Sequence, residues 1–338
     1  MRYFCTYFDQ NYLTRGLALH HSLMQHCGAF RLWVLCLDQA CFDVLRRMSL
    51  PGVIPISLNE LERGDEELVS AKQNRSRIEY YFTCTPVFPK FILEREPEVD
   101  LLTYLDSDLF FFSDVSPLYK EIGDNSVAII GHRFPSFLKE LEGAGIYNVG
   151  WVSFRNDERG RECLSWWRKR CIEWCYDRRE DGKYGDQKYL DDWPTRFPGT
   201  IVLQHKGANV APWNLATYPL ERKDGRVLVE GDPLVFYHFH GLKQLNQWVY
   251  DPSIHWYKHA LSSLVRRFVY VPYIRALLDA AHRIAPLLHA SSVSRGVRDQ
   301  VQVEPLFTRM AKKVKLVIQR VRLLLRCQYL FVLDRHIL

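Results

Sequence analysis

Two aspartates one residue apart, Asp106 and Asp108, are the residues of this chain whose spacing most directly suggests chemistry. They follow the apolar run "LLTYL" and precede "LFFF", although ionised carboxylates are costly to remove from water. Residues i and i+2 of a strand share one face, so both carboxylates can reach the same cation. Mg²⁺ and Mn²⁺ prefer oxygen ligands and often share them with a substrate's phosphates. The pattern therefore predicts a metal site, because a cation neutralises the charge.

Two other interpretations of this Asp-x-Asp segment stay open. In one, the segment is a solvated turn in which Asp108 caps a neighbouring element. In the other, an aspartate carries a phosphoryl group, but such sites normally have threonine or valine two residues after the second aspartate, where this chain has Phe110. The sequence shows no lysine-bearing partner motif downstream, which disfavours a phosphatase.

The elements that must position these residues alternate between strand-like and helix-like patterns. Strands are expected over 2–8, 30–38, 52–58, 99–108, 126–134, 148–156, 200–204 and 233–241, with helices over 13–27, 40–50, 79–96 and 158–179. Pro86 and Pro89 are expected to interrupt the third of these helices. Interleaved strands and helices predict an α/β fold whose mainly parallel sheet is covered on both faces. Ligands bind beyond the carboxyl ends of such strands.

Five segments occur in an order that suggests a known family: "FDQNYL", "YLDSDLFFFSD", "YNVGWVSFRND", "GDQKYLDDW" and "FYHFHGLK". On these segments, which span about residues 3–245, the chain resembles nucleotide-sugar glycosyltransferases of the GT-A fold. It is similar in layout to glycosyltransferase family 8. The resemblance implies a Rossmann-like fold and transfer of a sugar from a nucleoside-diphosphate sugar, with a UDP-sugar as the expected donor and a glycan or lipid-linked molecule as the acceptor.

The resemblance also implies roles for residues at matching positions. Mn²⁺ or Mg²⁺ would be held by Asp106, Asp108 and His238, with His240 on the same strand face as the alternative to His238. The expected donor-binding residues are Tyr7, Asp9, Asn11 and Tyr12 for the nucleoside, Asn148 and Gly150 for the sugar, and Gly241 and Lys243 near the diphosphate. A Trp-Asn pair at 213–214 also stands where the family leads one to expect it.

Asp186 and Gln187 would lie beside the donor sugar and carry catalysis. In an inverting reaction, a carboxylate deprotonates the acceptor hydroxyl as a general base. In a retaining reaction, a side chain on the other face of the sugar stabilises the oxocarbenium-like state. The resemblance favours retention, whereas the residue types leave both outcomes open.

The chain departs from the family pattern around the diphosphate. Lys243 is followed by Gln-Leu, where the family usually has Pro-Trp. The family also carries a basic residue on the helix before the metal motif, and the candidates for it here are Arg75, Arg77 and Lys90. The residue that clamps the phosphates is therefore open.

The C-terminal part of the chain differs from the rest in charge and pattern. We expect a transferase domain over 1–250 and a basic, amphipathic helical region over 251–338, including a helix over 309–333. From Lys258 onward, fifteen Lys/Arg stand against four Asp/Glu, so this part carries +11 and the remainder −5 of the net +6. Such a tail suits peripheral contact with an anionic membrane, or packing on the body or on a second subunit.

Composition narrows the remaining possibilities. No signal peptide or spanning segment is evident, and the nine cysteines show no regular spacing, which suggests reduced thiols. A cytoplasmic protein is therefore expected. Its basic tail would place it peripherally on the inner face of the cell membrane. Nucleic acid is not an expected partner, because the body has no recognition motif. A nucleotidyltransferase is disfavoured by the missing glycine-rich phosphate loop, and a non-catalytic carbohydrate-binding relative by the intact metal-binding residues.

Overall fold

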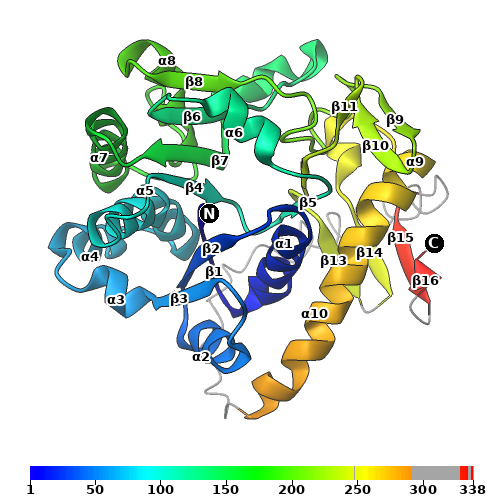
Figure 1. Ribbon diagram of the computed structural model, residues 1–338, viewed down its shortest axis with the longest axis horizontal. Coiled ribbons are helices and arrows are strands. Elements are labelled where there is room, and N and C mark those ends of the chain that lie inside the picture. The colour runs from blue at the N-terminus through cyan, green and yellow to red at the C-terminus, as the bar shows by residue number, and fades with distance from the viewer. Residues whose placement is uncertain (247, 291–327, 334–335, 338) are drawn as a thin grey trace, which may run out of the picture.

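The computed structural model describes residues 1–246, 248–290, 328–333 and 336–337. Its centre is a seven-stranded sheet (Figure 1). The strands lie in the order β3 (Val53–Ser57), β2 (Phe30–Cys36), β1 (Arg2–Phe8), β4 (Leu101–Leu105), β7 (Tyr147–Arg155), β6 (Val127–Gly131) and β8 (Thr200–Leu203). Neighbouring strands are parallel except where β7 pairs with β4 and β6. The expected α/β class with a mainly parallel sheet is confirmed.

Helices cover both faces of this sheet, as expected. One face packs against α1 (Leu13–His26), α2 (Gln39–Met48), α6 (Ser116–Ile122) and α10 (Val271–Ala290). The other packs against α3 (Leu58–Glu62), α4 (Glu66–Lys72), α5 (Arg77–Arg95), α7 (Glu158–Glu173) and α8 (Trp193–Arg196). Strand β1 divides its residues between the two, since Phe4 and Phe8 belong to the first cluster and Cys5 to the second.

The expected interruption of α5 by Pro86 and Pro89 is wrong. The helix is continuous over Arg77–Arg95, and it begins with a capping box between Ser76 and Glu79. Both prolines are buried, in a helix that packs into the second cluster. We attribute the continuity to this packing, which offsets the backbone hydrogen bonds that proline cannot make.

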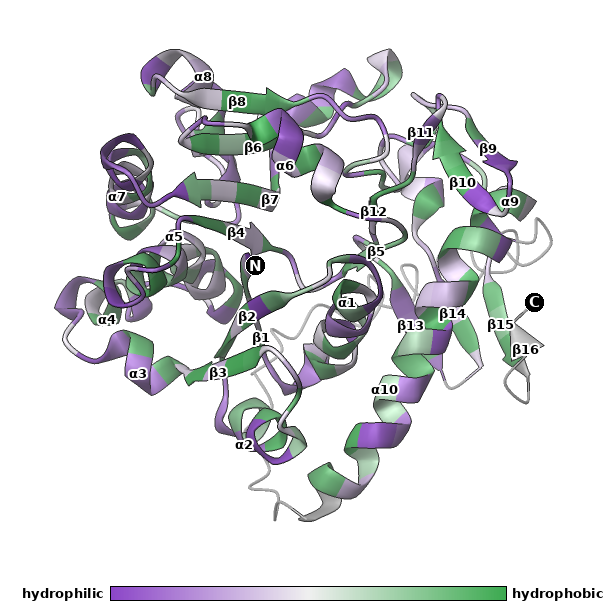
Figure 2. Ribbon diagram, in the orientation of Figure 1, coloured by the Kyte–Doolittle hydropathy of each residue, from purple (hydrophilic) through white to green (hydrophobic). Residues whose placement is uncertain are grey.

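Smaller sheets flank the central one, and the strand expected over 233–241 belongs to them rather than to the central sheet. Strand β5 (Leu109–Phe111) pairs with β12 (Phe236–His238), and β9 (Leu220–Lys223), β10 (Arg226–Val229) and β11 (Asp232–Pro233) form a three-stranded unit. A third apolar cluster, which includes Phe110, Tyr237, Phe239 and Tyr273, joins this region to α10. Figure 2 shows apolar and polar residues alternating along α10. Its buried residues Ile274 and Leu277 belong to the third cluster, and Ile284 belongs to the first.

The C-terminal region contains strands as well as helices. Helix α10 is helical as expected, after the short α9 (Ser263–Val265). Strands β13 (Lys243–Asn246), β14 (Val249–Asp251), β15 (Leu330–Leu333) and β16 (His336–Ile337) form one sheet. The helix expected over 309–333 is therefore wrong at its end, because the buried Leu330 pairs with Tyr250 of β14. Its earlier part lies outside the described residues. No helix in the described ranges is long and apolar enough to cross a membrane.

Candidate functional site

Asp106 and Asp108 lie between the end of β4 and the start of β5, at the carboxyl end of a central strand. The amide of Asp106 donates to the carbonyl oxygen of Gly150 on β7 at 3.1 Å. Its Oδ1 accepts a hydrogen bond of 2.9 Å from the hydroxyl of Tyr104, a residue of β4. Two neighbouring strands therefore hold the Asp-x-Asp segment at the edge where this class of sheet binds ligands.

The pairing of β12 with β5 brings His238 to the two aspartates. His238 pairs with Leu109, and its Nε2 lies 3.1 Å from Asp108 Oδ1 and 3.6 Å from Asp106 Oδ2. One ligand atom from each of the three side chains lies within 4.8 Å of the others. We call Asp106, Asp108 and His238 the aspartate–histidine cluster. Two carboxylates and a buried imidazole are a donor set that could hold a divalent metal ion.

The charges within this cluster depend on one another. Burial raises the pKa of Asp106, and Asp108 adds to the rise while His238 opposes it. Burial would also raise the pKa of Asp108, but the attraction of His238 outweighs it and the net shift is downward. Burial alone would lower the pKa of His238, yet the two carboxylates raise it. The two carboxylates therefore favour the protonated ring of His238 when no cation is bound.

His240, the alternative ligand, lies beside the cluster. Its ring centre is 5.9 Å from that of His238 and 5.5 Å from that of Trp213. Burial lowers the pKa of His240, which favours the neutral ring. Among the described residues, the group that lies close enough together to share an ion contains His238 but not His240.

Two cavities meet at the aspartate–histidine cluster. One, of about 490 Å³, is lined by Tyr12 and is called the Tyr12 cavity; the other, of about 410 Å³, is lined by Gln187 and is called the Gln187 cavity. The residues that line both are Tyr7, Phe82, Asp106, His238 and His240. A ligand that extends from one cavity into the other would therefore pass the cluster.

The expected nucleoside residues all line the Tyr12 cavity. Asp9 follows β1 and begins the 3₁₀ turn η1 (Gln10–Tyr12), where its Oδ1 accepts from the amides of Asn11 and Tyr12. Asn11 Nδ2 donates to Asp9 Oδ2 at 3.1 Å, so these two side chains hold each other. The Tyr12 ring is 42% exposed, and Tyr7 hydrogen bonds to Thr85 through its hydroxyl. Tyr12 therefore offers an open ring face, whereas Asp9 also has a structural role.

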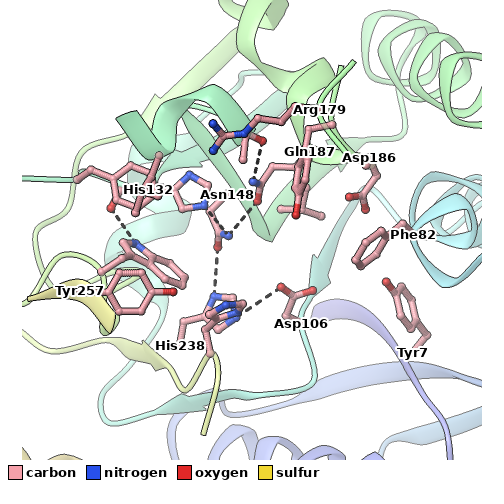
Figure 3. A pocket seen from close by; sticks show the side chains of 18 residues that line it. Tyr7, Phe82, Asp106, His132, Asn148, Arg179, Asp186, Gln187, His238 and Tyr257 are labelled. Carbon is pink, nitrogen blue, oxygen red and sulfur yellow. Dashed lines mark hydrogen bonds and ion pairs between the residues drawn. The ribbon is translucent and has the colours of Figure 1, made fainter. Parts of the chain in front are cut away.

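Asp186 and Gln187 line the Gln187 cavity, as Figure 3 shows. The buried indole of Trp167 donates to the carbonyl oxygen of Asp186 at 2.9 Å and fixes the start of η3 (Gln187–Asp192). Gln187 Nε2 donates to the carbonyl oxygen of Ala144 at 3.1 Å. Burial, with a further contribution from Asp106, raises the pKa of Asp186 to about 7. Near neutral pH this carboxyl group can therefore hold or release a proton.

Asn148 lines the same cavity, whereas Gly150 lies behind it. Asn148 Oδ1 accepts from the Gly150 amide at 3.1 Å and lies 3.2 Å from His238 Nδ1. A Cβ atom on Gly150 would lie 2.5 Å from Asn148 Oδ1 and 2.9 Å from His238 Nδ1. A side chain at position 150 would therefore displace Asn148 or His238, which pack against the glycine backbone.

Comparison with known proteins places this chain among bacterial relatives. It is 34% identical over 275 residues to the uncharacterised protein YfnD of Bacillus subtilis (strain 168), covering 80% of this chain and 87% of YfnD. It is 36% identical over 248 residues to the uncharacterised protein YfnF of the same strain, covering 71% of this chain and 81% of YfnF. The chain belongs to the family of YfnD and YfnF. No protein-family model matches it.

Solved structures similar to this YfnD-family chain include glycosyltransferases. Galactosyltransferase LgtC, in complex with donor and acceptor sugar analogues, aligns with a TM-score of 0.48 at 17% identity, over 70% of this chain and 87% of LgtC. Glycosyltransferase GlyE of Streptococcus pneumoniae TIGR4 aligns with a TM-score of 0.48 at 19% identity, over 89% of this chain and 66% of GlyE.

In this YfnD-family chain, the two residues expected near the diphosphate lie in the turn after β12 and on β13. Gly241 has a φ of +73° in the turn between β12 and β13, and its carbonyl oxygen accepts from Ser253 Oγ at 2.7 Å. Lys243 is exposed on β13 and is not among the residues that line the two cavities. Of the basic candidates before the metal motif, Arg77 lines the Tyr12 cavity. Arg75 instead donates to Tyr176 and to a backbone carbonyl of α7.

The sequence did not single out several side chains that line the Gln187 cavity. They are Phe82, His132, Phe134, Arg179, Tyr184 and Tyr257. His132 directly follows β6, just as Asp106 directly follows β4. Its place at the carboxyl end of a strand could therefore have indicated from the sequence that it belongs to the site. Burial lowers the pKa of His132 to about 3, which keeps its ring neutral. The aromatic residues lie on helices and loops and carry no comparable signal.

Proposed function

We propose that this YfnD-family chain is a metal-dependent glycosyltransferase of the GT-A type, similar to family 8. Its donor is a nucleoside-diphosphate sugar, with UDP as the proposed nucleotide, and its acceptor is a glycan or a lipid-linked molecule. One observation carries this proposal: the aspartate–histidine cluster lies where the two cavities meet. A nucleoside in the Tyr12 cavity and a sugar in the Gln187 cavity would place the diphosphate at the cluster.

The residues of the cluster fit Mn²⁺ or Mg²⁺. Asp106 and Asp108 supply oxygen ligands, and His238 directs Nε2 toward both carboxylates. When bound, the ion would supply Lewis-acid stabilisation for the charge that develops on the leaving diphosphate. Arg77, at the edge of the Tyr12 cavity, adds a guanidinium that can hydrogen bond to phosphate oxygens.

In the Tyr12 cavity, the residues of η1 bind and orient the nucleoside. The exposed ring of Tyr12 is available to stack on the base, while Asp9 keeps the turn in shape through its contacts with the amides of η1. The ring centre of Tyr7 lies 5.7 Å from that of Tyr104, and Tyr7 lines both cavities. The nucleoside is thereby held with its diphosphate directed toward Asp106.

In the Gln187 cavity, two side chains act on the sugar. The Ala144 carbonyl and Asn148 fix the Gln187 amide, and one Oε1 lone pair remains free to stabilise positive charge at the anomeric carbon. Asp186 accepts a hydrogen bond from a sugar hydroxyl when it is ionised, and it can donate one when it is protonated. This arrangement supports a retaining reaction, in which the leaving diphosphate and the acceptor use the same face of the sugar.

Binding and turnover measurements test this function. Calorimetric titration with UDP should show binding that depends on Mn²⁺ or Mg²⁺, and a panel of sugar nucleotides should identify one that the protein hydrolyses slowly without acceptor. A protein that binds sugars but no nucleotide would be a non-catalytic relative. A protein that joins a sugar phosphate to a nucleoside triphosphate would be a nucleotidyltransferase. Either result would replace the present proposal.

The role of the C-terminal region is also part of the proposal. The proposed transferase domain spans 1–250 and the basic region spans 251–338, and the charge of the basic region suits an anionic membrane surface. The amphipathic segment that motivates membrane contact lies outside the described residues. Sedimentation of the full-length protein with anionic vesicles at low salt tests the contact, and indifference to such vesicles would remove it.

A further inference from the structure

Arg179 is the only lysine or arginine among the described residues that line the Gln187 cavity. It lies in the loop over 174–186, between α7 and η3, and it is exposed to solvent. Within the described part of the chain, its side chain has no hydrogen-bond partner and no carboxylate at ion-pair distance. The neighbouring Arg178 instead pairs with Glu180 at 2.6 Å. The cavity therefore contains a guanidinium whose hydrogen-bond donors are available to a ligand.

The loop that carries Arg179 is held by hydrogen bonds on both sides of this residue. After it, the backbone groups of Glu180 and Lys183 exchange hydrogen bonds of 3.1 and 2.8 Å across a tight turn. Before it, the amide of Asp177 donates to Glu79 Oε1 on α5 at 3.0 Å. The backbone position of Arg179 is therefore fixed by the protein itself.

Arg179 and Gln187 lie against the same short segment of backbone. A Cβ atom on Gly143 would lie 2.8 Å from Nη1 of Arg179, and one on Gly145 would lie 3.0 Å from Cγ of Gln187. Gln187 Nε2 also donates to the carbonyl oxygen of Ala144, between these two glycines. Figure 3 shows Arg179 beside Gln187 and away from the aspartate–histidine cluster. A group held by Arg179 would therefore belong to the part of the ligand that lies beside Gln187.

The other ionisable groups of the cavity do not neutralise Arg179. Asp106 belongs to the aspartate–histidine cluster and lies 3.6 Å from His238. Burial raises the pKa of Asp186 to about 7, so this carboxyl group is partly uncharged at neutral pH. Burial also keeps the ring of His132 neutral, because its pKa falls to about 3. An anionic group on a ligand would therefore meet an unpaired guanidinium, which can bind a carboxylate through two parallel hydrogen bonds.

We propose that Arg179 binds a carboxylate on the sugar in the Gln187 cavity, so that the transferred sugar is a uronic acid. This inference rests on the proposed function for the presence of a donor sugar in this cavity, and it adds the chemical class of that sugar. Gln187 is proposed to act at the anomeric carbon, and Arg179 lies beside Gln187. A substituent of the same sugar ring is therefore the group that the guanidinium would meet.

Four variants isolate the contribution of the guanidinium. Arg179→Gln removes the charge and keeps a polar side chain, whereas Arg179→Lys keeps the charge without the planar pair of donors. Gly143→Ala displaces the guanidinium without changing its charge, because the added Cβ would lie 2.8 Å from Nη1 at the flexible end of Arg179. Arg178→Gln is the matched control, since Arg178 pairs with Glu180 and does not line the cavity.

Binding of sugar nucleotides in the presence of Mn²⁺ measures the preference for a carboxylate. UDP-glucuronate is compared with UDP-glucose, and UDP-galacturonate with UDP-galactose, by competition with a fluorescent UDP analogue. The wild type and Arg178→Gln should bind one acid about 10-fold more tightly than its neutral counterpart, because hydrogen bonds between charged groups are strong. Arg179→Gln should lose this preference, whereas Gly143→Ala and Arg179→Lys should reduce it. UDP alone should bind equally to all variants, because it lacks the sugar.

A second measurement, by saturation-transfer NMR, compares the methyl glycosides of the two uronic acids with those of glucose and galactose. Suppose that acid and neutral donors bind the wild type equally, while a methyl uronide binds the UDP complex of the wild type but not that of Arg179→Gln. That result would overturn the assignment to the transferred sugar and place the carboxylate on the acceptor.

The remaining results separate this inference from the proposed function. A preference for acids that Arg179→Gln retains, or no preference in either measurement, would overturn the inference. A protein that binds no UDP but binds a methyl uronide through Arg179 would refute the proposed function and support the recognition of a carboxylate. A protein that binds neither UDP nor a methyl uronide would refute both.

Discussion

His238 Nε2 lies 3.1 Å from Asp108 Oδ1 because His238 pairs with Leu109, the residue that follows Asp108, in the register of β12 and β5. In a strand, a shift of register by one residue turns every side chain to the opposite face. The β5–β12 pair thus decides whether a histidine reaches the two aspartates. The short strands are buried in apolar surroundings, which include Phe110 and Tyr237 of the third cluster.

Asp108→Asn should abolish the response of the protein to metal. Mn²⁺ should raise the melting temperature of the wild type, because a ligand that binds only the folded state stabilises it. The variant should show no such rise and should lose orders of magnitude in turnover, since a bound metal supplies several kcal/mol of transition-state stabilisation. Without metal and below neutral pH, the variant should melt somewhat lower than the wild type, because protonated His238 loses its partner. Thermal melts with and without Mn²⁺ measure this, with the exposed Asp124→Asn as control.

Tyr12→Ala should weaken binding of UDP and leave the fold intact. Tyr12 is 42% exposed and lies outside the three apolar clusters, so its loss leaves the core packing in place while taking away the stacking face of the Tyr12 cavity. Asp9→Ala should weaken binding too, but it should also lower the melting temperature, because losing a cap costs about 0.5–2 kcal/mol. Calorimetry with UDP and Mn²⁺ measures both, with the exposed Met24→Ala as control. Normal affinity in both variants would remove η1 from the nucleotide site.

Asp186→Asn should change how stability depends on pH. Burial raises the pKa of Asp186 to about 7, so the folded state keeps a proton that the unfolded state releases near pH 4. The free energy of unfolding of the wild type, relative to the variant, should therefore fall between about pH 4 and 7, by up to about 1.4 kcal/mol per pH unit. Above about pH 7 this difference should no longer change with pH. Urea denaturation of both metal-free proteins across this range measures the difference. A difference independent of pH would mean that Asp186 ionises normally.

Leu330→Ala should destabilise the protein although it is far from the site in sequence. Leu330 is fully buried and pairs with Tyr250, so its truncation should cost about 2–5 kcal/mol. Phe331, the next residue of β15, is only half-buried and points to the other face, so Phe331→Ala should cost less. Denaturant titrations of the two variants provide the comparison. Equal and small losses would show that β15 contributes little to the stability of the body.

Local patterns predicted the parts of the site that lie close together in the chain. The Asp-x-Asp segment follows an apolar run, and the end of that run is the end of β4 in the structure. Asp9 and Asn11, which the resemblance suggests for the nucleoside, likewise follow the first strand, and they line the Tyr12 cavity. Positions at the end of a strand can be located from the sequence because strand periodicity and the carboxyl-end rule act within a few residues.

Features that depend on distant segments were not predictable in the same way. Leu330 is a strand residue because β14 offers it a partner, and sequence periodicity alone does not distinguish this from the end of a helix. Pro86 is accommodated within α5 by tertiary packing, which local propensity does not describe.

Strand β3 borders the central sheet, and in the described part of the chain it pairs on one side, with β2. Pro55 stands in the middle of this strand, opposite Val34. Proline has no N–H group, so the free side of β3 cannot present an unbroken row of donors to another extended chain. Pro55 therefore works against edge-to-edge aggregation in concentrated solution, and replacing it with valine would extend the hydrogen-bonding edge that colliding molecules meet.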